Sequence, residues 1–209
     1  MLTAGVLGIL PLFPGPQSGG PHPDDALLDM LVWGTYMSVE PQAYSGELKA
    51  EVEAHLRRAN DYRSARPMPS SGDLKMVHEA QVHYERRLVA VADDPDAPRL
   101  AAAYVDALRP CYEWEGSHDC PEREALFADE YHSAHPEGPF RAYLPLLSAH
   151  RWLCAAEAYE YENQPADAAR SRQRSTERLA VARRSEHLLV RTAAARLAVR
   201  GRCVVTTVH

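Results

Sequence analysis

The sequence of 209 residues has little that would place it in a membrane or in a nucleotide-binding family. No stretch approaches the roughly 20 consecutive apolar residues that a membrane-spanning helix needs. The phosphate-binding patterns G-x-G-x-x-G and G-x-x-x-x-G-K-[ST] are absent, and so is the G-x-S-x-G frame of a nucleophile elbow. Nucleotide chemistry and serine-hydrolase chemistry are therefore without support, and we expect no cofactor.

Lysine is missing from the C-terminal part of the chain. Residues 166–209 contain ten arginines and three acidic residues, a local charge of +7, whereas residues 1–165 carry −13. The net charge of −6 argues against general nucleic-acid binding, because phosphates require a positive surface. One interpretation is that basic helices lie against an acidic body. The other is an anionic partner, nucleic acid or anionic lipid, held by planar guanidinium groups. The candidate residues are Arg170, Arg172, Arg174 and Arg178, followed by Arg183 and Arg184.

The overall composition is otherwise that of a globular protein. Apolar residues make up 45% and charged residues 25% of the chain, which excludes wholesale disorder. The length suits one domain. We expect a separate apolar segment with a Pro/Gly linker at residues 1–22 and a single helical domain at residues 23–209.

The first of these segments resembles a secretory signal. Residues 2–13 carry no charge and lead into a stretch rich in proline and glycine. No Lys or Arg precedes them and no clear small-x-small cleavage site follows, which departs from the signal-peptide pattern. The alternative is an apolar arm that packs on the domain. We expect a secreted or periplasmic protein.

Four cysteines allow three connectivities if all are paired. Cys111 and Cys120 are nine residues apart and enclose Gly116, which favours a disulfide that closes a loop between two helices. Cys154 and Cys203 would then form a second disulfide, which holds the C-terminal segment against a central helix. Such bonds persist in oxidising compartments, in agreement with export. The alternative is four reduced, buried thiols in a cytosolic protein.

Proline and glycine interrupt the chain at intervals of one helix length, and no internal segment has the alternation of a strand. We therefore expect an all-α fold of seven to eight helices. Short connections favour antiparallel hairpins, either in an irregular bundle or in a right-handed array. The expected helices cover about 24–40, 45–65, 74–91, 97–110, 121–134, 140–162, 166–183 and 186–200.

The long helix at 140–162 has an inner stripe formed by Leu147, His150, Cys154 and Tyr161, with Ala158 beside it. A lone histidine in such a stripe is expected to be a hydrogen-bonded core residue. A second pattern lies in the same helix and the next.

That pattern consists of Trp152, Ala156, Tyr159 and Ala168, whose spacing resembles the first half of a tetratricopeptide repeat (TPR). The resemblance covers one hairpin. It stops at Arg172, where a large apolar residue would be expected, and no second copy follows at a period of 34 residues. A TPR-like array and an irregular bundle both remain open.

Candidate metal ligands and acid–base pairs are few. His78 and His83 are five residues apart, so they point to different sides of a helix and do not form an H-E-x-x-H zinc pair. The loop with Cys111, His118, Asp119 and Cys120 favours a disulfide over a metal site. His132 and His135 have a permitted helical spacing near Glu130, and Glu113 and Glu115 flank Trp114. None of these sets is specific enough, and we expect no metal site.

The sequence therefore predicts an exported helical protein without enzymatic activity that binds a protein partner or acts as a scaffold. Tyr112 and Trp114 are candidate contact residues, because aromatic rings are common at the energetic centres of interfaces. One alternative is an enzyme whose site is assembled around His150 with Glu157 or Glu113. The other is anion binding by the arginine-rich helices.

Overall fold

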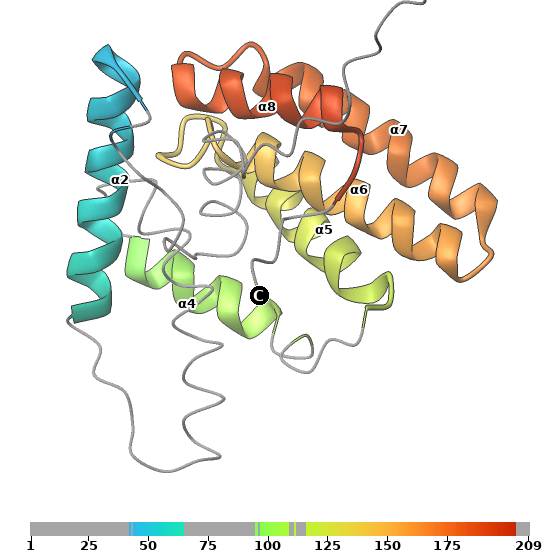
Figure 1. Ribbon diagram of the computed structural model, residues 1–209. Coiled ribbons are helices and arrows are strands. Elements are labelled where there is room, and N and C mark those ends of the chain that lie inside the picture. The colour runs from blue at the N-terminus through green and yellow to red at the C-terminus, as the bar shows by residue number, and fades with distance from the viewer. Residues whose placement is uncertain are drawn as a thin grey trace, which may run out of the picture.

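The computed structural model describes residues 42, 44–64, 95, 97–108, 111 and 116–203, and these form α-helices joined by turns, with no strand among them (Figure 1). The all-α prediction is confirmed for this part of the chain. The helices described are α2 (Gly46–Ser64), α4 (Ala97–Ala107), α5 (Asp119–Ala134), α6 (Leu144–Tyr161), α7 (Pro165–Ala182) and α8 (Leu188–Arg200).

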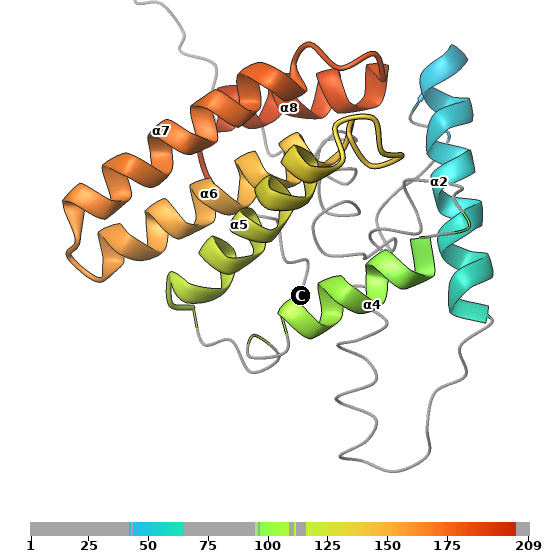
Figure 2. The same ribbon diagram turned by 180° about the vertical axis from the view of Figure 1, so that it is seen from behind.

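Helices α5, α6 and α7 run side by side, as both views of the molecule show (Figures 1 and 2). Each is joined to the next by a short connection, so that neighbours are antiparallel. Helix α8 packs on α6 and α7, and α2 contacts α8 at the other end of the molecule. Helix α6 thus lies between α5 and α7 and forms the centre of this arrangement.

The burial of α6 reflects its central position. Every residue from Leu144 to Ala156 is buried, whichever face of the helix it occupies. The predicted inner stripe is correct for Leu147, His150, Cys154 and Ala158, but it is wrong for Tyr161, which is 92% exposed. Tyr161 is the last residue of α6, at the tip of the α6–α7 hairpin, where the neighbouring helices no longer cover the face that continues the stripe.

The helix ends follow the chemistry of single residues. Helix α7 begins at Pro165, whose fixed φ suits the first turn of a helix. The preceding turn contains Asn163 with φ of 61°, a left-handed conformation that asparagine tolerates better than most residues. Helix α8 ends at Arg200, and the next residue, Gly201, also adopts a left-handed conformation and donates its N–H to the carbonyl of Leu197 at 2.9 Å. This turn sends the chain back toward α6.

Charged and polar groups link α5 to α6 inside the molecule. Arg151 Nε lies 2.6 Å from a carboxylate oxygen of Glu124, and both side chains are about 95% buried. Tyr104 of α4 donates a hydrogen bond to the other oxygen of Glu124. A buried ion pair that is also hydrogen-bonded fixes the register of its helices more than it adds to net stability.

Asp129 on α5 holds a second polar link between helices. Its Oδ1 accepts a hydrogen bond from Ser148 at 2.5 Å and forms an ion pair with Arg178, whose Nε lies 2.7 Å away. Its Oδ2 accepts a hydrogen bond from Trp152 Nε1 at 3.0 Å. One carboxylate therefore contacts three side chains from α6 and α7.

Both predicted disulfides are present: Cys111–Cys120 precedes and enters α5, and Cys154–Cys203 joins α6 to the segment after α8. The described residues contain no free cysteine. Two disulfides indicate an oxidising environment outside the cytoplasm. Among the helices described, none has the length and apolar character needed to cross a membrane.

The observed helices agree with most predicted ranges to within a few residues. Two expected helices, 24–40 and 74–91, lie outside the described residues, and so do the signal-like segment at 1–22 and the pair His78 and His83. The TPR-like residues Trp152, Tyr159 and Ala168 are buried in one small cluster with Ala125 and Ala155.

Candidate functional site

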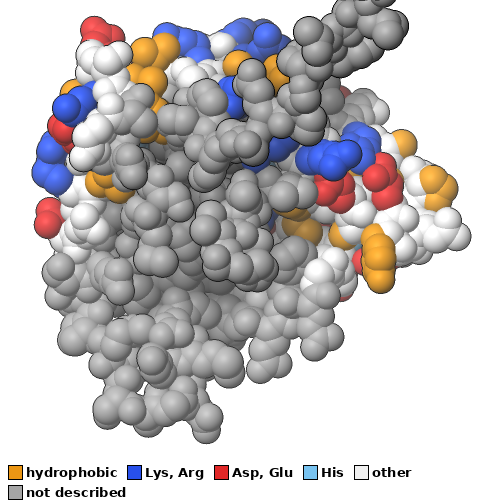
Figure 3. Space-filling view, viewed as in Figure 1, with side chains coloured by type: hydrophobic (Ala, Val, Ile, Leu, Met, Phe, Trp, Pro, Cys, Tyr) orange, Lys and Arg blue, Asp and Glu red, His pale blue; other side chains and the backbone are white. Residues whose placement is uncertain are grey.

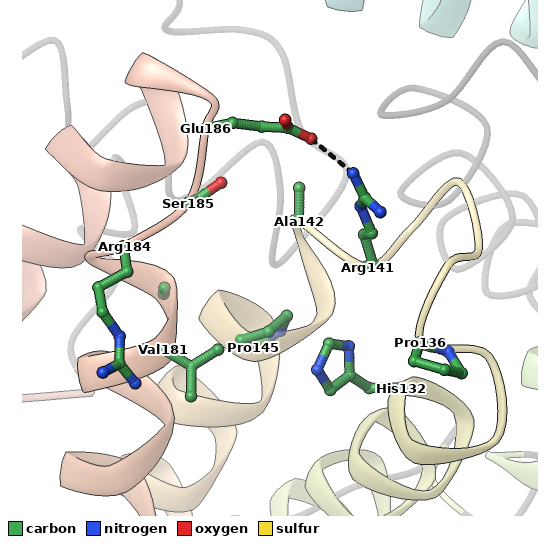
Figure 4. A pocket seen from close by; sticks show the side chains of 10 residues that line it. His132, Pro136, Arg141, Ala142, Pro145, Val181, Arg184, Ser185 and Glu186 are labelled. Atoms are coloured by element: carbon green, nitrogen blue, oxygen red, sulfur yellow. Dashed lines mark hydrogen bonds and ion pairs between the residues drawn. The ribbon is translucent and has the colours of Figure 1, made fainter.

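An open groove lies between the turn after α5 and the end of α7 (Figure 4). Helix α5 ends at Ala134 because Pro136 cannot continue the hydrogen-bonding pattern of the helix. The chain then turns tightly, and Gly138 donates its N–H to the carbonyl of His135 at 3.0 Å. A Cβ atom at Gly138 would lie only 3.1 Å from that carbonyl oxygen, a tight contact, so the turn favours glycine.

The other wall of the groove comes from the end of α7. This helix stops at Ala182, and the chain turns through Arg184 and Ser185 before α8. Ser185 Oγ accepts a hydrogen bond from the N–H of His187 at 3.2 Å, which stabilises this connection. The two turns are joined across the groove by an ion pair between Arg141 and Glu186 at 3.1 Å, drawn as a dashed line in Figure 4.

The groove has a volume of about 350 Å³ and is lined by both apolar and polar side chains. This volume is at the lower end of the range for ligand sites in proteins. The apolar lining residues, here called the floor, are Pro136, Ala142, Pro145, Val181 and Ala182; the polar lining residues, here called the rim, are His132, Arg141, Arg184, Ser185 and Glu186.

The charges on the rim differ in how they are balanced. The ion pair raises the pKa of Arg141, chiefly through its hydrogen bond with Glu186, and the same bond lowers the pKa of Glu186. The side chain of Arg184 is exposed and makes no ion pair or hydrogen bond within the part of the chain that the structure describes. The groove therefore presents one unbalanced positive charge beside an apolar floor.

His132 lies on the opposite side of the groove from Val181, with Pro145 between them (Figure 4). Burial lowers the pKa of His132, and the nearby charge of Arg178 lowers it further against the opposing effect of Asp129. Its Nδ1 is buried and has no hydrogen-bond partner among the described residues. The lowered pKa favours the neutral form of His132.

Four of the six arginines predicted as an anion site lie on α7, and each of these is engaged within the molecule, whereas the exposed Arg183 and Arg184 follow the helix. Arg170 pairs with Asp167, and Arg172 pairs with Glu160 of α6 at 2.7 Å. Arg174 lies over the ring of Trp152 at 4.4 Å, and Arg178 pairs with Asp129. Figure 3 shows basic side chains next to acidic ones over this hairpin. The other two predicted contact residues, Tyr112 and Trp114, lie outside the described residues.

A second, smaller cavity of about 120 Å³ lies where α5, α6 and α7 meet. Its Tyr159 donates a hydrogen bond to Glu122 at 2.5 Å, and burial followed by this bond raises the pKa of Tyr159. His118 stacks on the same ring and contacts Glu162 through Nδ1 at 2.6 Å. The polar groups of this cavity therefore bind one another rather than facing an open site.

The histidines considered as ligands from the sequence have other contacts. His135 stacks on Tyr131 and contacts its carbonyl through Nδ1 at 3.1 Å, while His132 lines the groove. His118 contacts Asp119 and Glu162. Within the described ranges, one group of three potential ligand side chains lies close enough together to hold a metal ion. It consists of His150, Cys154 and Cys203.

Sequence reasoning did not find the groove. Its two walls are about 45 residues apart in the chain, and only the fold brings them together. The available signals were the H-P-E-G-P break after α5 and the adjacent Arg183 and Arg184 at the end of α7. The chain matches no known protein-family model, no curated protein and no solved structure. Its function is therefore inferred from the groove itself.

Proposed function

We propose that this is an exported, non-enzymatic helical protein that binds an extended, acidic segment of a protein partner in the groove between α5 and α7. The observation that carries this proposal is an apolar floor next to Arg184, a cation with no partner in the described part of the chain. Apolar side chains of the segment would cover the floor, and a carboxylate would pair with Arg184.

An extended segment suits the groove better than a compact small molecule. The groove is open to solvent rather than enclosed, and the ion pair of Arg141 with Glu186 joins its two walls. Apolar residues alternating with an acidic residue match its floor and its charge. Segments of this kind gain affinity from a few anchoring side chains rather than from total area.

A nucleic acid is a weaker candidate. The net charge of the chain is −6, and Arg170, Arg172 and Arg178 already pair with carboxylates of the same molecule. A polyanion would need several free cations along one surface. The groove offers a single such charge, which fits one carboxylate.

Export is part of this proposal. The apolar segment at 1–13 resembles a secretory signal, and the two disulfides favour an oxidising compartment. We also propose that the α6–α7 hairpin packs in the manner of a TPR unit, within seven to eight helices in the whole chain. The joint burial of Trp152, Tyr159 and Ala168 supports that packing.

A displayed library of random peptides, selected on the oxidised protein, tests the binding proposal. We expect enriched peptides to carry an acidic residue next to apolar ones. Arg184→Glu should weaken binding of the enriched peptides about tenfold or more, since it reverses the one unbalanced charge. Arg183→Glu is the matched control, because Arg183 is exposed beside Arg184 but does not line the groove.

A second pair of variants tests the floor. Val181→Trp fills the groove and should abolish binding, whereas Ala180→Trp places the same ring on the neighbouring exposed residue. The proposal is wrong if no peptide is enriched, or if each variant and its control weaken binding equally. Preserved helical circular dichroism in all four variants ensures that a loss reflects the groove.

A further inference from the structure

The second disulfide has an imidazole directly beside it. His150 and Cys154 are four residues apart on α6 and therefore lie on the same face of the helix. His150 Nδ1 lies 3.5 Å from Cys154 Sγ, and its Nε2 lies 3.9 Å from the same sulfur. The potential ligand atoms of His150, Cys154 and Cys203 all lie within 4.8 Å of one another.

Two further contacts fix the segment that carries Cys203. The carboxylate of Glu157, on the same face of α6, accepts a hydrogen bond from the N–H of Cys203 at 2.8 Å. The carbonyl oxygen of Cys203 lies 3.0 Å from His150 Nε2. Cys203 is therefore held against α6 by its backbone as well as by its sulfur.

The second contact also determines the state of the imidazole. A carbonyl oxygen only accepts hydrogen bonds, so Nε2 of His150 must carry the proton. In neutral His150 the lone pair is then on Nδ1, the nitrogen nearest to Cys154 Sγ. Histidines that bind metals are commonly oriented by a hydrogen bond of this kind from the other ring nitrogen to a carbonyl.

We propose that reduction of the Cys154–Cys203 disulfide creates a zinc site formed by His150 Nδ1 and the two cysteine thiolates. The set of one imidazole and two thiolates is one that Zn²⁺ prefers, and three protein ligands leave one position for water. The segment after α8 would then be linked to α6 by the disulfide in the oxidised state and by the metal ion in the reduced state.

The distances support this geometry. With Zn–S of about 2.3 Å and Zn–N of about 2.0 Å, the nitrogen and sulfur ligands of a tetrahedral ion lie roughly 3.5 Å apart. His150 Nδ1 and Cys154 Sγ already have this separation. Two thiolate ligands lie roughly 3.8 Å apart, so the sulfurs must separate after reduction. Because Cys154 Sγ is 3.5 Å from Nδ1 and 3.9 Å from Nε2, it lies to the side of the ring, and the freed Cys154 side chain must also turn toward the lone pair of Nδ1.

The redox step requires a dithiol reductant. Its thiolate attacks Sγ of Cys203, the less buried of the two cysteines, and Cys154 leaves as a thiolate beside His150. The second thiol of the reductant then displaces Cys203 and forms a disulfide within the reductant. Two electrons and two protons pass to the protein, and zinc binding releases the two protons from the cysteines.

The first disulfide provides a control within the same molecule. Cys111–Cys120 belongs to no group of three potential ligands among the residues described. The nearby His118 is engaged with Glu162. Reduction of this disulfide should therefore create no zinc site, and the variant Cys111→Ser/Cys120→Ser isolates the second pair.

The test is a titration of this full-length variant with Zn²⁺ against a chromophoric chelator, before and after reduction with a phosphine under anaerobic conditions. We expect no tight binding before reduction and one equivalent after it. Co²⁺ in place of Zn²⁺ should give the thiolate-to-cobalt absorption of a tetrahedral site. His150→Gln keeps a donor for the Cys203 carbonyl but removes the imidazole, and should weaken zinc binding at least about 100-fold.

The outcomes separate the proposal from simpler explanations. Equal zinc affinity with and without His150→Gln would mean that the thiols bind zinc without the imidazole, and would overturn the proposal. So would the absence of stoichiometric binding after reduction. If reduction lowers the helical content, Zn²⁺ should restore it in the parent variant but not in His150→Gln, and a failure to restore it counts against the site.

Discussion

Two opposite faces of α6 are held to the rest of the molecule in different ways. One faces α5, where Ser148, Arg151 and Trp152 contact the carboxylates of Glu124 and Asp129. The other faces the segment after α8 and carries His150, Cys154 and Glu157, which all contact Cys203. At 3.6 residues per turn, these two sets lie on opposite sides of the helix.

The central helix is thus fixed in two ways, on one side by charge and hydrogen bonds and on the other by a covalent bond. Charge and hydrogen bonds depend on both partners, so their loss is costly when one partner remains buried. A disulfide acts mainly by restricting the unfolded chain, and its effect is removed by reduction. The α5-facing side should therefore respond to pH and single substitutions, and the opposite side to redox conditions.

The largest expected effect is on the α5-facing side. Arg151→Met removes the guanidinium and leaves the carboxylate of Glu124 buried beside Tyr104. Breaking a buried pair in this way should lower the free energy of unfolding by about 3–5 kcal/mol. Urea unfolding followed by circular dichroism measures this change.

A double variant distinguishes a buried charge from lost packing. Arg151→Met combined with Glu124→Leu removes both charges and should recover most of the lost stability, because no uncompensated carboxylate remains. Stability that stays as low as in the single variant would mean that packing, not charge, accounts for the effect. The comparison between the two faces would then fail on this side.

The second prediction concerns the tail-facing side and uses the two disulfides as a matched pair. Cys154–Cys203 joins residues 49 apart, and Cys111–Cys120 joins residues nine apart. The chain-entropy relation assigns roughly 4 kcal/mol to the longer loop and roughly 2.6 kcal/mol to the shorter one. Cys154→Ser/Cys203→Ser should therefore destabilise the oxidised protein about 1.4 kcal/mol more than Cys111→Ser/Cys120→Ser.

Urea unfolding of the two variants under the same oxidising conditions measures this difference. An equal or reversed order would show that the tail is held by the contacts of His150 and Glu157 more than by the bond. The same measurement on the reduced wild-type protein should show both losses together.

Much of this fold could be predicted from the sequence because its signals are local. Proline and glycine interrupt the chain at the helix ends, and the pairing of Cys154 with Cys203 followed from the short loop between the other two cysteines. His150 was correctly expected to be a buried, hydrogen-bonded residue. Its neighbours Cys154 and Cys203 were identified as a disulfide, so two of the three proposed zinc ligands were visible from spacing alone.

The remaining features depend on tertiary contacts. The apolar periodicity of α6 predicts that Tyr161 is buried, because periodicity assumes that neighbouring elements cover one face along the whole helix. At the tip of the α6–α7 hairpin that face is no longer covered, and Tyr161 is exposed. The groove needs residues 132–145 next to residues 181–186, which no periodicity indicates. The sequence shows that α7 is rich in arginine, but it does not show that Arg172 pairs with Glu160 and Arg178 with Asp129, because these pairs depend on how the helices pack.

The smallest expected effect is a pH dependence on the α5-facing side. Burial and Arg178 lower the pKa of His132 below its ordinary value of 6.5. The unfolded chain then binds more protons than the folded protein between these two pKa values, so stability should fall as pH decreases through about 6.5. His132→Gln removes this titration and should flatten the dependence by less than about 1 kcal/mol, because solvent screens the partly exposed ring. Urea midpoints at pH 5 and pH 7.5 measure the slope, and Cys154→Ser/Cys203→Ser should leave it unchanged.

An identical slope in His132→Gln would remove His132 from the charge balance around Asp129, and a changed slope in the cysteine variant would mean that the two faces of α6 are coupled.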